Sequence, residues 1–255
     1  MSHAYTEEAD GILTVVLDRD EKLNAISPEM TAELWEAVRA LASRDELRAL
    51  VITAVGRYFS AGIDLGAPSA TSTASTGSQF RAAYRQHHLL YDEMEAVEKP
   101  VVLAAQGPCL GAGLEMACSC DFRFAAQGAR FQLPEVRLGV IPGSGGVSRL
   151  TRLVGPHWGK WLAMAGRSVS AEQALAMGLV HEVLPLEGFA AAVRERVQEI
   201  IALPAEALGA AKLAVDLAAD VDRGTARHVE RLANTHLMLA GAMEGTRGKF
   251  GGAPA

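Results

Sequence analysis

Aromatic residues, cysteines and basic clusters are all scarce in this sequence. Aromatic residues fill 5% of the 255 positions, so a hydrophobic core must be built mainly from Ala, Val, Leu and Ile. The three cysteines, Cys109, Cys118 and Cys120, lack the supporting His or Cys cluster that a metal site requires, and we interpret them as small buried side chains. The net charge is −6 and there is no block rich in Lys or Arg, which argues against a general nucleic-acid-binding protein.

Long hydrophobic runs are missing as well. No apolar stretch reaches the roughly 18 residues of a membrane span. The N-terminal region places acidic residues before a short apolar run and lacks the basic segment and cleavage pattern of a signal peptide. We therefore expect a soluble, cytoplasmic protein with no membrane partner. A hydrophobic content of 49% suits one large domain, or one domain with a small appendage.

Predicted strands and helices alternate along the first two thirds of the chain, which indicates an α/β domain with parallel strand pairs. A helix is expected from Pro28, with Ser27 as its N-cap, and a long helix is expected from residue 79 up to Pro100. The pair His87 and His88 in that helix is interpreted as surface. The polar, small-residue segment 67–78 before it predicts a mobile loop.

The last third of the chain is predicted to be helical. Three helical segments follow Pro185, at 187–202, 204–219 and 222–241. On this basis we divide the chain into a core at 1–195 and a C-terminal helical region at 196–255.

Two turns of small residues each follow a predicted strand. The first covers 60–64 and the second 111–113. Small residues let a ligand approach the backbone closely, and two N–H groups from separate turns can hold one developing oxyanion. Either turn alone is more readily explained as ordinary tight packing.

Two glutamates stand in apolar surroundings, Glu115 within "LGAGLEMACSC" and Glu135 within "FQLPEVRLGV". A buried carboxylate needs a partner or a raised pKa, so the two residues are candidates for an acid–base pair. Taken singly, Glu115 could be a first-turn helix residue favoured by the helix dipole, and Glu135 a surface residue after Pro134.

Five segments together resemble the crotonase superfamily, also called the enoyl-CoA hydratase/isomerase family. In order they are "LNAIS", "GRYFSAGIDL", "KPVVLAAQGPCLGAGLEMACSCDFRFA", "FQLPEVRLGVIPGSGGVSRLTRLVG" and "AEQALAMGLVHEVLP". The resemblance implies a crotonase-type spiral of β-β-α turns followed by a C-terminal helical oligomerisation region. It also implies a homotrimer or a dimer of trimers, in which Lys249 and Phe250 are the candidates for touching CoA bound to a neighbour.

The resemblance further implies an acyl-CoA substrate, with CoA as part of the substrate and no separate cofactor or metal. The backbone N–H groups of Ala61 and Ala112 would form the oxyanion hole; relatives often have glycine at the second position. Substrate contacts would come from Ala61, Gly62, Ile63, Asp64 and Ala112, and more loosely from Lys22 and Leu23 near the nucleotide.

Glu115 and Glu135 match the two glutamates of enoyl-CoA hydratases. The implied reaction is the reversible hydration of trans-2-enoyl-CoA to 3-hydroxyacyl-CoA, in fatty-acid β-oxidation or related acyl-CoA catabolism. Glu115 would activate the water and Glu135 would protonate C2. The alternatives are an enoyl-CoA isomerase working through Glu135 alone, another acyl-CoA-processing member, and a non-catalytic or RNA-binding member.

Overall fold

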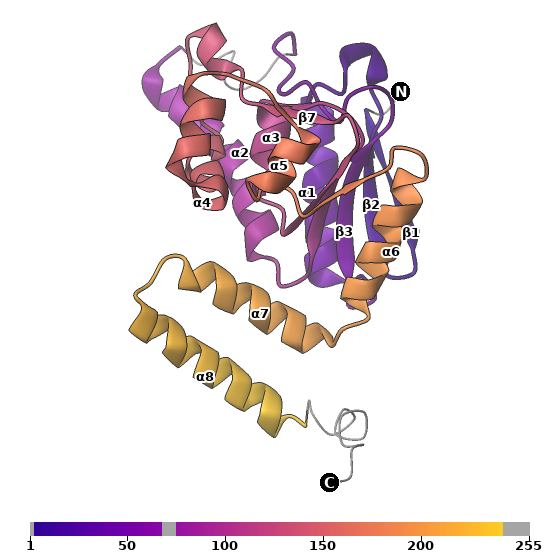
Figure 1. Ribbon diagram of the computed structural model, residues 1–255, viewed down its shortest axis with the longest axis vertical. Coiled ribbons are helices and arrows are strands. Elements are labelled where there is room, and N and C mark those ends of the chain that lie inside the picture. The colour runs from indigo at the N-terminus through magenta and orange to yellow at the C-terminus, as the bar shows by residue number, and fades with distance from the viewer. Residues whose placement is uncertain (1–2, 68–74, 242–255) are drawn as a thin grey trace. The chain divides into compact units, whose positions relative to one another are not determined.

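The computed structural model describes residues 3–67 and 75–241, which fall into two compact units (Figure 1). The first unit ends at Ile201 and the second begins at Ala202. The boundary that we placed after residue 195 lies inside helix α6 (Phe189–Ile201). That helix buries Val193, Val197 and Ile201 against the sheet of the first unit, so it belongs to that unit as a whole.

A six-stranded sheet forms the centre of the first unit. Its strands, in spatial order, are β1 (Ala4–Ala9), β2 (Ile12–Leu17), β3 (Ala49–Ala54), β4 (Val101–Ala105), β6 (Phe122–Ala126) and β9 (Glu182–Leu184). Only β1 and β2 are antiparallel, joined by a two-residue turn in which Asp10 and Gly11 both have positive φ, as a tight hairpin requires. The other pairs are parallel, which confirms the pattern predicted from alternating strands and helices.

Helices connect the strands of this unit. They are α1 (Pro28–Ser43), α2 (Gly77–Ala96), α3 (Ala112–Ala117), α4 (Gly146–Gly159), α5 (Ala171–Ala176) and α6, with short turns η1 (Asp20–Lys22), η2 (Glu135–Leu138) and η3 (Lys160–Met164). The predicted start of α1 is confirmed, because the Ser27 hydroxyl accepts from the N–H of Met30. Helix α2 begins at Gly77, so the end of the segment that we predicted as a loop is its first turn. The rest of that loop, 68–74, lies outside the described residues.

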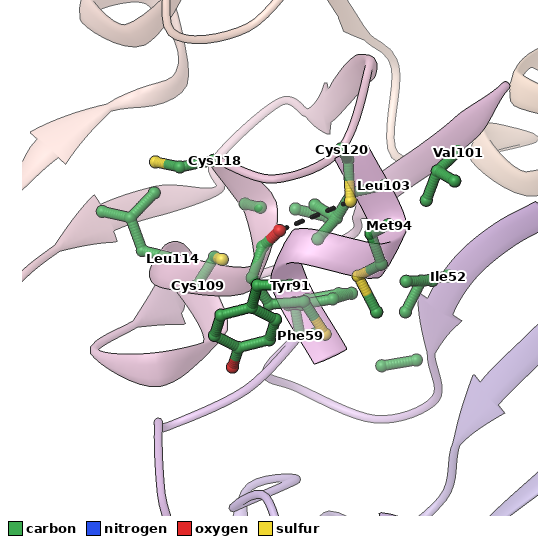
Figure 2. Packing of buried hydrophobic residues seen from close by; sticks show 14 of the residues in the cluster. Ile52, Phe59, Tyr91, Met94, Val101, Leu103, Cys109, Leu114, Cys118 and Cys120 are labelled. Atoms are coloured by element: carbon green, nitrogen blue, oxygen red, sulfur yellow. Dashed lines mark hydrogen bonds between the residues drawn. The ribbon is translucent and has the colours of Figure 1, made fainter. Parts of the chain in front are cut away.

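The core has two parts, one on each face of the sheet. Alternate strand residues divide between them: Leu50 and Ile52 of β3 face one side, and Ala49 and Val51 face the other. Helices α1, α2 and α3 cover the first face, and α6 covers the second. Figure 2 shows part of the first face, where the three cysteines are packed among apolar side chains and the thiol of Cys120 donates to the Met116 carbonyl. Their predicted role as buried apolar side chains is confirmed.

A smaller, three-stranded sheet positions the candidate site. Its strands, in spatial order, are β5 (Cys109–Leu110), β7 (Arg130–Gln132) and β8 (Val169–Ser170). Ser60 pairs with Cys109 in a parallel bridge, so the start of the turn at 60–64 runs beside β5. As a result, the two small-residue turns leave the same edge of this sheet next to each other.

The described part of the second unit consists of two helices that pack against each other, α7 (Ala205–Ala218) and α8 (Arg223–Leu239). Together with α6 they confirm the three helical segments predicted after Pro185. Lys249 and Phe250 lie outside the described residues. Across 3–67 and 75–241, no helix combines the length and the apolar character needed to cross a bilayer.

Candidate active site

The two small-residue turns approach each other so closely that glycine is required between them. Gly62 has φ +99°, and a Cβ at this position would lie 3.2 Å from the Leu110 carbonyl oxygen and 3.4 Å from the Ala112 nitrogen. A Cβ on Gly113 would lie 2.8 Å from the Cβ of Ser60. Side chains larger than hydrogen would therefore push the two turns apart.

Asn24, the second residue of "LNAIS", holds the turn at 60–64 in place through hydrogen bonds. Its buried side chain donates to the carbonyls of Val55 and Tyr58, and its own carbonyl accepts from the Ser60 hydroxyl. The preceding residue, Leu23, has φ +53°, a strained conformation for a branched side chain. This bend directs the Leu23 carbonyl at the turn.

The proposed oxyanion role of Ala61 is wrong for this structure. The Ala61 N–H already donates to the Leu23 carbonyl at 2.9 Å, so it has no free hydrogen to offer a ligand. Its neighbour Ile63 is the available donor. Ile63 forms a parallel bridge with Ile26, in which the carbonyl of Gly62 and the N–H of Asp64 face Ile26, so the N–H of Ile63 faces the other way.

The role of Ala112 as the second donor, which the resemblance implies, stays a prediction that the structure leaves open. It is the first residue of α3, and its N–H donates to none of the described residues, as is usual in the first turn of a helix. Its φ is not positive, so alanine in place of glycine introduces no backbone strain. The positive φ falls on Gly111 instead, at +52°. Where the turns meet, the N–H groups of Ile63 and Ala112 thus have no acceptor among the described residues.

Glu115 lies one helical turn after Ala112 in α3, with 3% of its surface exposed. Its Oε1 accepts from the N–H of Ser144 at 2.7 Å and from the N–H of Gly146 at 3.0 Å. A Cβ on Gly146 would lie 2.8 Å from both Cγ and Oε1 of Glu115, so only glycine allows this contact. Burial raises the pKa of Glu115, while the two N–H groups and the positive charge of Arg149 act in the opposite direction.

Glu135, the first residue of η2, lies beside Gly111 and close enough to Glu115 to be affected by its charge. A Cβ on Gly111 would be 2.9 Å from the Glu135 Oε1, and Oε2 is buried without a hydrogen-bond partner among the described residues. Burial, and to a smaller extent the nearby charge of Glu115, raise the pKa of Glu135 to about 7. The two N–H groups thus favour the ionised form of Glu115 against the effect of its burial, whereas Glu135 is disposed to keep a proton near neutral pH.

The raised pKa of Glu135 predicts a pH-dependent change in stability. Since its pKa is 4.5 when unperturbed and about 7 in the folded chain, the folded state binds the proton more tightly between these values. The stability that this proton contributes is complete below pH 4.5 and is lost as the pH rises to about 7. Glu135→Gln should therefore raise the melting temperature at pH 8, by about 2–4 °C for a gain on the order of 1 kcal/mol.

The control for this prediction is the same pair of proteins at pH 5, where wild type and Glu135→Gln should melt within about one degree of each other. Thermal unfolding followed by circular dichroism measures both. A difference that is equal at the two pH values would show that Glu135 does not keep its proton in the folded state.

Helix α2 contributes side chains to the candidate site, which the sequence analysis did not predict. The hydroxyl of Tyr91 donates to the Ala112 carbonyl at 3.2 Å, and burial strongly raises the pKa of this tyrosine. The surface position predicted for His88 is wrong, because its Nε2 contacts the Gly143 carbonyl at 2.6 Å in a partly buried setting. The side chain of His87 lies outside what the structure describes. The spacing of residues 84, 88 and 91 along one helix face was the signal that could have revealed this contact.

Asp64 has a different environment from the other predicted substrate contacts. Its Oδ2 accepts from the Nη1 of Arg19 at 2.6 Å, and this contact lowers the pKa of Asp64. The pair lines a pocket of about 500 Å³ that includes Lys22, one of the predicted nucleotide contacts. The complete lining is His3, Arg19, Lys22, Ser27, Pro28, Glu29, Asp64, Gly66 and Ala67. Within the described ranges, no group of three or more His, Cys, Asp or Glu side chains could hold a metal ion.

The fold and site can be compared with known proteins. A sequence model of the enoyl-CoA hydratase/isomerase family matches residues 7–244. The chain is 35% identical to 2,3-dehydroadipyl-CoA hydratase of Escherichia coli (strain K12), over 72% of this chain and 70% of the relative. It is 34% identical to crotonyl-CoA hydratase of Syntrophomonas wolfei, over 85% of this chain and 83% of the relative.

A solved structure agrees with these relatives. The crystal structure of enoyl-CoA hydratase from Thermoplasma volcanium GSS1 superimposes with a TM-score of 0.87 at 29% identity, over 98% of both chains. This match confirms the predicted crotonase-type α/β fold with its helical C-terminal region. The chain belongs to the enoyl-CoA hydratase/isomerase family.

Proposed function

We propose that this protein is an enoyl-CoA hydratase, a lyase that reversibly adds water across the C2=C3 bond of a trans-2-enoyl-CoA in β-oxidation or related acyl-CoA catabolism. The observation that carries the proposal is the pair of Glu115, which is buried, and Glu135, which is half-buried beside Gly111 with its Oε2 shielded from solvent, near two backbone N–H groups that have no acceptor among the described residues. The names of the hydratase relatives support the same reaction and an acyl-CoA substrate.

The free N–H groups of Ile63 and Ala112 would bind the thioester carbonyl oxygen. Hydrogen bonds from both donors withdraw electrons from the conjugated system and make C3 electrophilic. They also stabilise the negative charge that develops on the oxygen when water attacks C3. Because both donors are backbone groups set by glycine turns, they are in place before the substrate binds.

The two glutamates would move the protons. Glu115, whose ionised form is held by the N–H groups of Ser144 and Gly146, would take a proton from water as the water oxygen bonds to C3. Glu135, which keeps its proton near pH 7, would deliver that proton to C2. One proton leaves water and one joins carbon, and exchange with solvent restores both carboxyl groups.

A direct assay tests the proposed function. Purified wild-type protein is mixed with crotonyl-CoA, and the absorbance of the conjugated thioester is followed with time. The proposal predicts loss of this absorbance with formation of 3-hydroxybutyryl-CoA, which in ¹⁸O-labelled water carries the label on C3. Intact absorbance with crotonyl-CoA and with longer trans-2-enoyl-CoA substrates would refute it.

The oxyanion donors give a prediction about Ile63. Ile63→Pro removes the N–H without breaking a hydrogen bond of the described structure, so the chain should fold while kcat falls on the order of a hundredfold. Ile63→Ala is the matched control, because it shortens the side chain and keeps the N–H. Steady-state kinetics with crotonyl-CoA checks both variants; a folded Ile63→Pro protein with wild-type kcat would exclude Ile63 as a donor.

We also propose that the protein forms a homotrimer or a dimer of trimers. Large apolar side chains are exposed in both units of the described chain. In the first unit they include Val136, Leu138, Val140 and Ile141, and in the second Leu213, Val215, Leu232 and Leu239. Exposed apolar side chains that cluster along short stretches of the chain, such as 136–141, are typical of subunit contacts. Sedimentation equilibrium at micromolar concentration tests the proposal, which a stable monomer would overturn.

A further inference from the structure

One face of α2 lies against the turn that holds Glu115. Tyr84, His88, Asp92 and Glu95 follow one another at helical spacing, and each contacts the segment 143–149 or a side chain from it. The spacing keeps all four on one side of the helix. Helix α2 and this segment are therefore joined at several points rather than by a single contact.

The first two of these residues act on the turn itself. His88 donates from Nε2 to the carbonyl of Gly143 at 2.6 Å, which identifies Nε2 as the nitrogen that carries hydrogen. The Tyr84 hydroxyl packs on the same glycine, where a Cβ would lie 2.6 Å from it. A stack of Phe80 on Tyr84 and an edge contact of Tyr84 with His88 fix the two rings relative to each other.

The last two residues anchor the end of the turn through Arg149. Glu95 binds the guanidinium with both carboxylate oxygens, at 2.8 Å and 2.7 Å, and Asp92 binds it at 2.5 Å. Arg149 in turn donates to the Ser144 carbonyl at 3.4 Å. Helix α2 therefore sets the position of Arg149, and through it that of the Ser144 carbonyl, as well.

The same turn, 143–146, also donates hydrogen bonds directly to the Glu115 carboxylate. The peptide unit between Gly143 and Ser144 places its carbonyl oxygen on His88 and its N–H on the Glu115 carboxylate. These two groups belong to one rigid plane, so a force that orients the carbonyl also orients the N–H. A hydrogen bond from His88 to one side of the plane therefore fixes the direction of the donor on the other side.

We propose that His88 and Tyr84 are positioning residues for Glu115, acting through the peptide plane between Gly143 and Ser144. Neither residue has to touch the substrate for this role. The expected effect on kcat rests on the proposed function. The expected effect on the pKa of the Glu115 carboxyl group does not depend on any reaction.

Loss of the His88 hydrogen bond should loosen the peptide plane and weaken the bond from the Ser144 N–H to Glu115. Because that bond stabilises the carboxylate form, its weakening should raise the pKa of Glu115. The other charged or titratable groups that act on or near this carboxyl group are Arg149, Glu135, Tyr84, Tyr91 and Cys118. Of these groups only Tyr84 contacts His88, through the edge contact of the two rings.

The test compares two substitutions at His88. His88→Leu removes the donor, and His88→Gln keeps an N–H at nearly the position of Nε2. We expect His88→Leu to lower kcat for crotonyl-CoA about tenfold with KM within about twofold, and His88→Gln to restore kcat to within about twofold of wild type. Gln86→Ala, an exposed substitution on the same helix, is the control and should leave kcat and KM unchanged.

The second readout is the pKa of the Glu115 carboxyl group, measured by carbon-13 NMR in the absence of substrate. His88→Leu should raise it by roughly half a unit or more, and His88→Gln and Gln86→Ala should leave it in place. If wild type failed to hydrate any enoyl-CoA, the proposed function would fail while this measurement still tested the positioning role.

If His88→Leu does not fold, Tyr84→Phe replaces it, with a smaller expected rise in the pKa of Glu115. A folded His88→Leu or Tyr84→Phe protein with an unchanged Glu115 pKa would overturn the inference.

Discussion

Glu115→Gln is expected to lower kcat for the hydration of crotonyl-CoA by roughly 10²–10⁴-fold, the range for losing a general base. Glutamine has the same size, and its carbonyl oxygen can still accept from the N–H groups of Ser144 and Gly146. The fold and the substrate site should therefore survive. The amide cannot take a proton from water, however, so the attack on C3 loses its base. Steady-state kinetics with crotonyl-CoA measures the loss.

The control for this variant is Glu93→Gln, the same substitution at an exposed position of α2. It should leave kcat and KM within about twofold of wild type, because exposed substitutions away from a site are usually close to neutral. Should folded Glu115→Gln hydrate crotonyl-CoA at the wild-type rate, the hydratase assignment would be lost. An isomerase that works through Glu135 alone would then explain the site better.

Glu135→Gln is expected to have an effect of the same size for the opposite reason. At neutral pH Glu135 is the group that keeps a proton, and its Oε2 has no partner among the described residues. An amide in its place cannot supply a proton to C2. Hydration at pH 6 should therefore fall roughly 10²–10⁴-fold, while the KM for crotonyl-CoA should change little.

The pH dependence of the wild type supplies the check on this second prediction. As the pH rises through about 7, Glu135 ionises and loses its ability to act as an acid, so kcat/KM should decline above that value. In Glu135→Gln the small residual activity should no longer show this decline. A wild-type kcat/KM that stays constant from about pH 6 to 9 would contradict the assignment of Glu135 as the acid.

Much of the fold could be predicted from local patterns in the chain. Helix α1 follows from Ser27, Pro28 and the apolar spacing after them, and the parallel sheet follows from the alternation of strands and helices. These features depend on neighbours a few residues away, which the sequence displays directly. The two glutamates were found in the same way, because a charged residue inside an apolar run is visible without a structure.

The oxyanion donor was mispredicted because the direction of a backbone N–H is set by pairing between distant segments. Ala61 and Ile63 lie two positions apart in one turn, and only the hydrogen bond from Ala61 to Leu23 and the bridge between Ile63 and Ile26 decide which N–H is free. His88 was misplaced for a similar reason. Its partner is a carbonyl 55 residues away, and a main-chain carbonyl leaves no mark in the sequence.

The double variant Glu115→Gln/Glu135→Gln gives the most direct test that the two glutamates act together on one water and one C2=C3 bond. Its kcat for crotonyl-CoA is measured beside those of both single variants, in one buffer and with folding confirmed by circular dichroism. If the groups share a step, either single change disables that step, so the double variant should lose much less than the product of the two single losses. A loss equal to that product would mean that the two carboxyl groups contribute independently, and would contradict the acid–base pair on which the account depends.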